Sequence, residues 1–458
     1  MDIKTGIYAA HRELSECSAA FLEFAAKEPA CLERPGFDTL LSDRRFTYFK
    51  SQPWPTFINQ KKKNEMAQAV LKINNLVKCL MSRFFAYDQQ KISNYYEIEP
   101  GMTKILLHGV DDNHIHNLLG RGDFIITPAG EFKCLEFNMQ SNMGGWELDL
   151  LEPLYIETPI IAQFLKGSNI QVRKNHFFHL LIEHVLDIFC EKLPLASKIR
   201  QKGEINMAIV FPNRIEQNIT FEYLRNLYKQ VLLKKNNAWT GDIFICGYES
   251  MKIIDYFLIY AGRKIDIMVE MLNGGTEIKY MEAVKKGNLV LCNGPVTRIM
   301  SNKLNLALLS EYQDSEIFNL EERELIKKHI PWTRKIIHVD REFLLAQRER
   351  LVLKSAEGLG GHDVFPGWRM AAEEWQQKIE KAREEKRWVV QEYVPSSQYL
   401  YQYGKSGCTE HHAVWGLFVL GSRYAGGFVR VMPAKNNTGV INTAQGAEES
   451  IIIEVEES

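Results

Sequence analysis

The sequence predicts a mixed α+β protein that contains a helical N-terminal region, an α/β unit and further groups of paired strands. Apolar residues recur at helical spacing through most of the first 100 residues. Apolar strand runs alternate with helical segments from about residue 175 to 300, a pattern typical of a largely parallel sheet. With 458 residues in all and roughly 100–200 residues per domain, we expect about two to four domains.

The composition is that of an ordinary globular protein, with 45% hydrophobic residues, 25% charged residues and a net charge of -1. The near-zero net charge argues against a general nucleic-acid binder, which needs a clustered basic surface. The N-terminal residues are charged, and no later run approaches the roughly 20 apolar residues of a membrane span. We therefore expect a cytoplasmic protein without membrane or nucleic-acid partners.

Eight cysteines are scattered along the chain without a CxxC pair, which argues against a zinc site or a disulfide framework. We expect most of them to be small buried apolar residues. They are Cys17, Cys31, Cys79, Cys134, Cys190, Cys246, Cys292 and Cys408.

The first third of the chain predicts helices followed by a hairpin. Apolar spacing favours helices at 8–28 and 64–86, separated by a break at Pro53 and Pro55. Two short strands, Asp123–Thr127 and Phe132–Phe137, follow, and Pro128, Ala129 and Gly130 form the turn between them.

The remaining elements follow in alternation and then as α+β segments. In the α/β unit, helices are predicted at 175–193, 221–235 and 254–262, and strands at 205–211, 241–247, 265–271 and 288–294. Beyond it, helices are predicted at 302–312, 320–329 and 371–387, and strands at 350–354, 388–394 and within 411–432.

A lysine at the end of an apolar run precedes three glycines in VLKSAEGLGGHDV, residues 352–364. Lys354 supplies a compact charge, and Gly358, Gly360 and Gly361 let backbone N–H groups approach phosphate oxygens. The lysine precedes the glycines, so the segment is not the GxxxxGK[ST] loop. A structural glycine-rich turn is the alternative.

Two more segments offer groups that a nucleotide needs. Gln391 and Glu392 end the apolar strand VVQEYVP, where backbone groups can meet an adenine edge, although an ordinary strand end is the alternative. Arg430 emerges from the strand GGFVRVM and can reach a phosphate in forked geometry, although a solvated strand arginine is the alternative.

Three oxygen-bearing side chains are expected to converge on the predicted hairpin. Glu136 and Asn138 alternate along one strand and share a face, and Asp123 lies on the partner strand. Hard oxygen ligands of this kind suit magnesium together with substrate phosphates. A solvated sheet face is the alternative.

Together, the order of these motifs resembles the circularly permuted branch of the ATP-grasp superfamily, which includes glutathionylspermidine synthase-like proteins and other circularly permuted ligases. The metal residues come first here, whereas conventional ATP-grasp chains place the lysine and the glycine loop first. The resemblance spans roughly residues 100–450 and is carried by RGDFIITPAGEFKCLEFN, NGPVTRIMSNKLNLALLSE, IPWTRKI, VLKSAEGLGGHDV, VVQEYVP and YAGGFVRVMPAKNNTGVINTAQGA.

The resemblance implies a role for each matching residue. Lys354 and Arg430 are implied in catalysis, with Lys354 also on the nucleotide phosphates and Arg430 on the triphosphate or the acyl phosphate. Arg334, in IPWTR, falls where a first cationic phosphate contact is expected, whereas Lys303 occurs in the same context in similar proteins without an assigned role. The implied nucleotide contacts are Lys354, Gly358, Gly360, Gly361, Gln391, Glu392, Val394 and Arg334, and the implied metal ligands are Asp123, Glu136 and Asn138.

The resemblance also implies a permuted ATP-grasp fold with a pre-ATP-grasp-like α/β unit. The expected parts are a helical region at 1–100, a metal-binding half of the core at 101–170, the α/β domain at 171–300, and a nucleotide-binding lid with the rest of the core at 301–458.

The implied activity is an ATP-dependent carboxylate-amine ligase that forms an amide or peptide bond through an acyl phosphate, in peptide or secondary-metabolite biosynthesis. ATP and Mg²⁺ are the expected cofactors, with room for two ions. Small-molecule or peptide acids and amines, free or bound to a carrier protein, are the expected partners. A homodimer is the commonest assembly of soluble enzymes. An ATP-grasp phosphotransferase and a non-catalytic nucleotide-binding protein are the alternatives.

The segment after the metal ligands departs from the glutathionylspermidine synthases, which continue with an Asp-Thr-Pro-Thr-like sequence. This chain has Met139–Trp146 there and no attached amidase domain, so polyamine specificity is not carried over, and the segment is the expected place for substrate contacts. Other polar features are expected to be structural: His411 beside His412 on a strand, the polar loop at 111–116, and the charged helix at 371–387.

Overall fold

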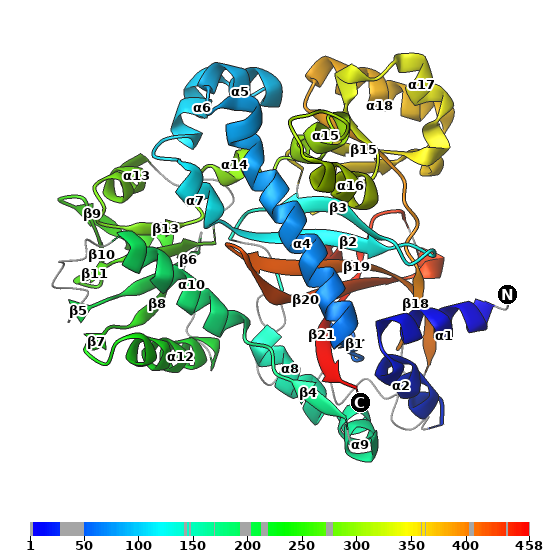
Figure 1. Ribbon diagram of the computed structural model, residues 1–458, viewed down its shortest axis with the longest axis horizontal. Coiled ribbons are helices and arrows are strands. Elements are labelled where there is room, and N and C mark those ends of the chain that lie inside the picture. Colours follow the sequence, from blue (N-terminus) through cyan, green and yellow to red (C-terminus); the bar gives the residue numbers. More distant parts are fainter. Residues whose placement is uncertain are drawn as a thin grey trace.

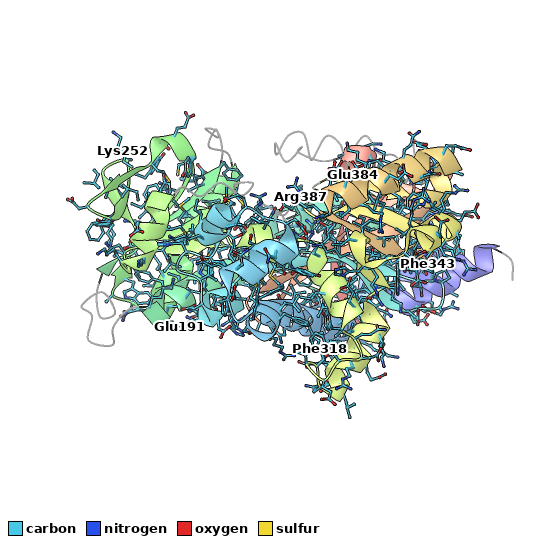
Figure 2. All side chains as sticks on the ribbon, turned by 90° about the horizontal axis from the view of Figure 1, so that it is seen from above. Glu191, Lys252, Phe318, Phe343, Glu384 and Arg387 are labelled. Atoms are coloured by element: carbon cyan, nitrogen blue, oxygen red, sulfur yellow. The ribbon has the colours of Figure 1, made fainter. Side chains whose placement is uncertain are left out.

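The structure is a computed structural model that describes residues 3–457, apart from 28–49, 142–143, 146–147, 169, 193–202, 212–218, 272–277, 359, 362, 403–406 and 437. Three bodies are visible: a large central sheet, a small sheet with its own helices, and an α/β unit (Figure 1). Seen from above, Lys252 of the α/β unit and Phe343 of the small-sheet body lie toward opposite ends of the molecule (Figure 2).

The central sheet joins the two ends of the chain. Its strand order is β1-β21-β20-β19-β2-β3, with β18 paired to β19 and β4 paired to β21. The first strand, β1, runs parallel to the last strand, β21, while the other pairs are antiparallel. The strands are β1 (Thr56–Asn59), β2 (Leu119–Ile126), β3 (Phe132–Asn138), β4 (Gln171–Arg173), β18 (Gln398–Gln402), β19 (Cys408–Leu420), β20 (Arg423–Pro433) and β21 (Glu448–Glu456).

The β2–β3 hairpin confirms the two strands predicted on either side of Pro128, Ala129 and Gly130. The turn closes with a hydrogen bond from Gly130 N to Thr127 O (2.8 Å), and Gly130 has a φ of 78°, which a side chain would disfavour. β2 begins at Leu119, earlier than predicted, because the chain enters the sheet as soon as helix α7 (Asp112–His116) ends.

A long helix, α4 (Gln60–Leu80), crosses the central sheet and contacts β2, β3, β19, β20 and β21 (Figure 1). The Asn59 side chain caps its N-terminus through Lys62 N. Helices occupy most of the described part of the N-terminal region, and β1 interrupts them. Its other helices are α1 (Ile3–Leu14), α2 (Glu16–Lys27), η2 (Met81–Phe85), α5 (Gln89–Tyr96) and α6 (Pro100–Leu106).

The α/β unit has the predicted parallel sheet, in the order β13-β12-β6-β8. Its apolar strands are buried on both faces, as expected for a sheet covered by helices. The strands are β6 (Met207–Phe211), β8 (Ile243–Gly247), β12 (Ile267–Glu270) and β13 (Val290–Cys292), and the helices are α10 (Phe177–Lys192), α12 (Ile219–Lys235) and α13 (Ile278–Lys285).

The predicted helix at 254–262 is wrong. This segment contributes to the sheet β9 (Lys252–Ile254), β10 (Phe257–Tyr260) and β11 (Arg263–Ile265). Asp255 and Tyr256 have φ values of 49° and 64°, and Gly262 has 76°, so left-handed residues form a turn at each end of β10. Residues with positive φ cannot continue a helix, but they are the residues that tight turns between antiparallel strands require.

The small sheet has the antiparallel order β14-β17-β15-β16 and carries the lysine and glycine motif. A separate core that includes Trp375, Ile379 and Leu353 joins it to its helices. The strands are β14 (Thr333–Lys335), β15 (Leu351–Ser355), β16 (Val364–Pro366) and β17 (Trp388–Glu392), and the surrounding helices are α15 (Leu304–Glu311), α16 (Leu320–His329), α17 (Arg341–Ala346) and α18 (Ala372–Glu385).

Several minor predictions are tested by the same structure. The polar segment at 111–116 is not a loop: it is α7, which Asp111 caps through His114 N. Cys17, Cys134, Cys246 and Cys292 are buried as expected, whereas Cys408 is exposed; Cys31 lies outside the described residues. Among the described residues, no helix has the length and apolar character to cross a membrane.

Lys78 ties α4 to the segment that leads from α7 into β2 and to the turn between β19 and β20. Its ammonium group donates to the carbonyl oxygens of His116 (2.7 Å), Leu118 (3.2 Å) and Gly421 (2.8 Å), and the residue is buried. Because an ammonium has three donors, the three carbonyls are all satisfied by one side chain.

We expect Lys78→Met to lower the free energy of unfolding by about 2–4 kcal/mol, since it leaves three carbonyl groups without this donor. Urea unfolding followed by circular dichroism measures the change. Lys61→Met, at an exposed position of the same helix, is the matched control and should stay within about 0.5 kcal/mol of the wild type. Equal stability of the two variants would contradict the structural role of Lys78.

Candidate active site

The predicted metal residues meet at the open end of the β2–β3 hairpin. Asp123 lies opposite Glu136 in the strand register, and Arg121 lies opposite Asn138. Residues two apart on a strand share a face, so all four side chains project to the same side of the central sheet. Asp123, Glu136 and Asn138 thus line one cavity, together with Arg121.

This cavity has a volume of about 430 Å³ and lies between the central sheet and the small sheet. Ten of the twelve residues singled out by sequence line it, and Gly358 and Arg334 do not. Those ten are Asp123, Glu136, Asn138, Lys354, Gly360, Gly361, Gln391, Glu392, Val394 and Arg430.

Two arginines hold Asp123 in place. Arg121 donates to both carboxylate oxygens (Nε to Oδ1 2.7 Å, Nη2 to Oδ2 3.1 Å), and Arg430 Nη2 donates to Oδ2 at 2.7 Å. Burial opposes ionisation of Asp123, but the Arg121 and Arg430 guanidinium groups outweigh it and lower the pKa of the carboxyl. Asp123 is therefore a carboxylate at neutral pH.

The same two arginines lie against the aromatic ring of Phe428. The Arg121 guanidinium carbon is 5.2 Å from the ring centroid, and that of Arg430 is 5.8 Å away. Gly416, on the neighbouring strand, makes this packing feasible, because a Cβ there would lie 2.6 Å from Phe428 and 3.1 Å from the Arg121 side chain. Arg121 was not predicted as a site residue, although its position two residues before Asp123 on a strand was the available signal.

Lys354 reaches into the cavity from the small sheet. Its Nζ donates to Gln391 Oε1 (2.5 Å) and to Leu135 O (3.3 Å), so it connects the small sheet to the hairpin of the central sheet. The pKa of Lys354 is lowered to about 8, mainly by burial; Glu136 opposes this shift, and Lys303 contributes to it. The lysine is mostly charged at pH 7.

The end of β17 forms the less polar part of the cavity. Gln391 also donates through Nε2 to Thr333 Oγ1 (3.0 Å), which orients its amide toward Lys354. Val352, Tyr393 and Val394 line the wall next to it. An apolar wall of this kind is a suitable environment for a heterocyclic base.

Arg334 is not brought to the cavity. Its Nη1 donates to Ser310 Oγ and to Thr333 O, both at 2.8 Å, and its guanidinium lies over the Trp332 ring. Since Thr333 faces Gln391, its neighbour on the strand must face the opposite way. The geometry therefore does not support the predicted phosphate contact of Arg334.

Lys303 lies between the hairpin and the residues after β15 that include Gly358, Gly360 and Gly361, which we call the glycine segment. Its Nζ is 3.2 Å from Glu136 Oε1 and donates to Gly358 O at 2.6 Å, and the side chain is buried. Lys303 thus holds Gly358, at the start of the glycine segment, and Gly360 and Gly361 farther along the segment line the cavity.

A segment that sequence reasoning left unassigned closes the cavity from the other side. Gly439, Val440, Ile441, Asn442 and Thr443, between β20 and β21, contribute to its lining. A Cβ on Gly361, which has a φ of 73°, would lie 2.8 Å from Val440, and Gln445 Nε2 donates to Gly361 O at 3.3 Å. The glycine segment and the 439–445 segment are therefore in contact.

The segment Met139–Trp146 is placed in part beside the same cavity. Gln140 and Gly144 line it, and Arg121 Nη1 donates to Gly144 O at 3.2 Å. Residues 142, 143 and 146 of this segment lie outside the described residues. Glu449, from β21 and opposite Arg430, also lines the cavity without having been predicted.

The residues at the cavity fit a magnesium ion better than a metal that needs a complete protein cage. In the described part of the chain, no three His, Cys, Asp or Glu side chains cluster to hold a metal. Glu136 and Asn138 supply hard oxygens, as does Asp123 beside its arginines, and magnesium is typically held by one or two carboxylates plus phosphates and water.

Residues 276–391 match the model of a family described as a circularly permuted ATP-grasp. The match confirms the predicted resemblance and the predicted fold class, and it covers the small sheet that carries Lys354 and Gln391.

Among solved structures, D-alanyl-alanine synthetase A from Vibrio cholerae O1 biovar eltor is similar at 10% identity, with a TM-score of 0.28. The similarity covers 54% of this chain and 74% of that one. No curated protein matches the sequence.

The pKa of Lys354 predicts how nucleotide binding varies with pH. Only the ammonium form attracts phosphate, so we expect MgATP affinity to fall about tenfold between pH 7 and pH 9, as the lysine loses its proton above pH 8. Lys354→Arg keeps its charge over this range and should bind MgATP with little pH dependence. Calorimetric titration at several pH values measures both proteins, and identical pH profiles would rule out Lys354 as the source.

Proposed function

We propose that this chain, whose residues 276–391 match a circularly permuted ATP-grasp family, is an ATP-dependent carboxylate-amine ligase that works through an acyl phosphate. The observation that carries the proposal is the convergence of Lys354, Arg430, Asp123, Glu136 and Asn138 on one cavity, which the two sheets build together. The small sheet supplies the cation Lys354, and the central sheet supplies Arg430 together with the hard oxygens of Asp123, Glu136 and Asn138; a metal-bound triphosphate requires both kinds of group.

The first step of the proposed reaction is phosphoryl transfer. An acid oxygen attacks the γ-phosphorus of ATP, the bond to the β-γ bridging oxygen breaks, and ADP leaves. Catalysis of such a step depends on positioning and on charge stabilisation. Lys354 would hold the transferring phosphate, and Arg430 would stand on the opposite wall. Magnesium at Glu136 and Asn138 would supply positive charge to the phosphate oxygens.

In the second step, an amine attacks the acyl carbon and phosphate leaves, while the amine loses a proton. Negative charge develops on the carbonyl oxygen, so a fixed donor nearby lowers the barrier. Arg430 is suited to this role because its Nε is buried and has no hydrogen-bond partner among the described residues. Its Nη2 is already fixed by Asp123, so the guanidinium is oriented before substrate binds.

Water must be kept from the acyl phosphate, since hydrolysis would waste the ATP. The glycine segment and the 439–445 segment are the parts of the chain that cover the cavity. We propose that Gln140 and Gly144 contact the acid or amine substrate, which is a small molecule or a peptide, free or held on a carrier protein. A role in peptide or secondary-metabolite biosynthesis is part of the same proposal.

Hydroxylamine trapping tests the proposal. We expect the protein with MgATP and pooled amino acids or short peptides to release ADP and, when hydroxylamine is added, to form a hydroxamate, because hydroxylamine replaces the amine in attack on the acyl phosphate. Colorimetric detection of the hydroxamate together with ADP release measures both products. ADP release without hydroxamate would favour a phosphotransferase, and MgATP binding without ADP release from any pool would favour a non-catalytic nucleotide-binding protein.

Glu136→Gln in the same assay should lower both products by at least about 100-fold, since it removes a charged metal ligand, and circular dichroism should be unchanged. Glu131→Gln, at an exposed position of the same hairpin, is the matched control and should keep wild-type rates. Equal activity of the two variants would contradict the assignment of the metal site.

A further inference from the structure

The base of the glycine segment is bound to a short stretch that follows the α/β unit. Lys303 N donates to Ala356 O (2.9 Å), Arg298 pairs with Glu357, and Lys303 Nζ donates to Gly358 O (2.6 Å). Three consecutive residues after Lys354 and Ser355 are thus each held by residues in or next to helix α14 (Thr297–Met300).

The contact between Arg298 and Glu357 is the charged part of this attachment. Arg298 Nε and Nη2 both donate to Glu357 Oε2, at 3.1 and 3.0 Å. The side chains are 33% and 27% exposed, and Glu357 Oε1 is buried without a hydrogen-bond partner among the described residues. Loss of Arg298 would therefore leave a partly buried carboxylate without its counter-charge, which costs more than loss of an exposed pair.

The same stretch also fixes the metal-binding hairpin. Asn293, just after β13, donates through Nδ2 to the carbonyl oxygens of Leu119 and Met139, both at 2.8 Å, and accepts from Leu119 N through Oδ1. Ser301 Oγ accepts from Met139 N at 2.8 Å. Residues 293–303 therefore contact the open end of the hairpin, where β2 begins and β3 ends, and also the base of the glycine segment.

We propose that Arg298 is a positioning residue that holds the base of the glycine segment so that Gly360 and Gly361 stay over the nucleotide phosphates. The inference rests on the proposed function, because it assumes that a triphosphate occupies the cavity. Arg298 does not line the cavity, so its effect must pass through Glu357. A segment held at three successive residues loses less conformational freedom when it closes on a ligand, and binding is correspondingly tighter.

The test compares two probes, Mg²⁺ with a non-hydrolysable ATP analogue and AMP alone, by calorimetry. We expect Arg298→Met to weaken binding of the triphosphate analogue about fivefold while AMP affinity changes by less than about twofold, since the glycine segment covers the terminal phosphates. The doubly substituted protein Arg298→Glu with Glu357→Arg should recover most of the loss. A general structural defect would weaken both probes alike, and that result, or no change with either probe, would overturn the proposal.

Arg341→Met is the matched control. Arg341 pairs with Glu380 at 2.8 Å and is 39% exposed, in the same small-sheet body but between α17 and α18. We expect it to leave the affinity for both probes unchanged. If Arg341→Met weakened binding of the triphosphate analogue as much as Arg298→Met does, then loss of any ion pair in the small-sheet body would have the same effect, and the proposal would be overturned.

A further readout needs no nucleotide. Hydrogen exchange at the amides of Ala356, Glu357 and Gly358 should become faster in Arg298→Met and return toward the wild-type rate in the charge-exchanged protein. If the wild type bound no triphosphate analogue, the proposed function would fail, and this exchange measurement alone would decide whether Arg298 holds the segment. Unchanged exchange would then overturn the attachment itself.

Discussion

One buried carboxylate between two guanidinium groups organises the candidate site. Asp123 on β2 accepts from Arg121 on the same strand and from Arg430 on β20, and all three residues are buried. Buried charges are stable only when they are paired, so each fixes the position of the others. The Phe428 ring packs against both guanidinium groups.

The second half of the site comes from a different sheet, and Lys354 joins the two. Its contacts with Gln391 on β17 and with Leu135 on β3 cross from the small sheet to the central sheet. A charge buried at such a junction is costly unless a ligand or a carboxylate offsets it, which explains its lowered pKa. The chain order, with the β2–β3 hairpin before the lysine and β1 beside β21, is consistent with a permuted ATP-grasp.

Much of this arrangement was predictable because it depends on local rules. Alternation along β3 placed Glu136 and Asn138 on one face. Asp123 shares that face because the register shifts between Phe124 and Asp123, so that Asp123 pairs with Glu136 and not with Leu135, and a shift of this kind is not visible in the sequence pattern. Other features depend on contacts that are distant in sequence. Arg334 points away from the cavity because its neighbour Thr333 is hydrogen-bonded to Gln391. The apolar run Phe257–Tyr260 suits either a helix or a strand, and the left-handed residues on both sides of it favour the strand. The lining by Val440 and Asn442 required knowledge of how two segments meet.

The central claim is that both sheets bind one nucleotide, and hydrogen exchange with and without Mg²⁺ and a non-hydrolysable ATP analogue tests it most directly. The account predicts slower exchange in the β2–β3 hairpin, at Gly358 and Gly361, at the end of β17 and at Val440–Thr443. It predicts no change in β6 and β12 of the α/β unit. Slower exchange confined to the α/β sheet, or to one of the two cavity walls, would contradict it.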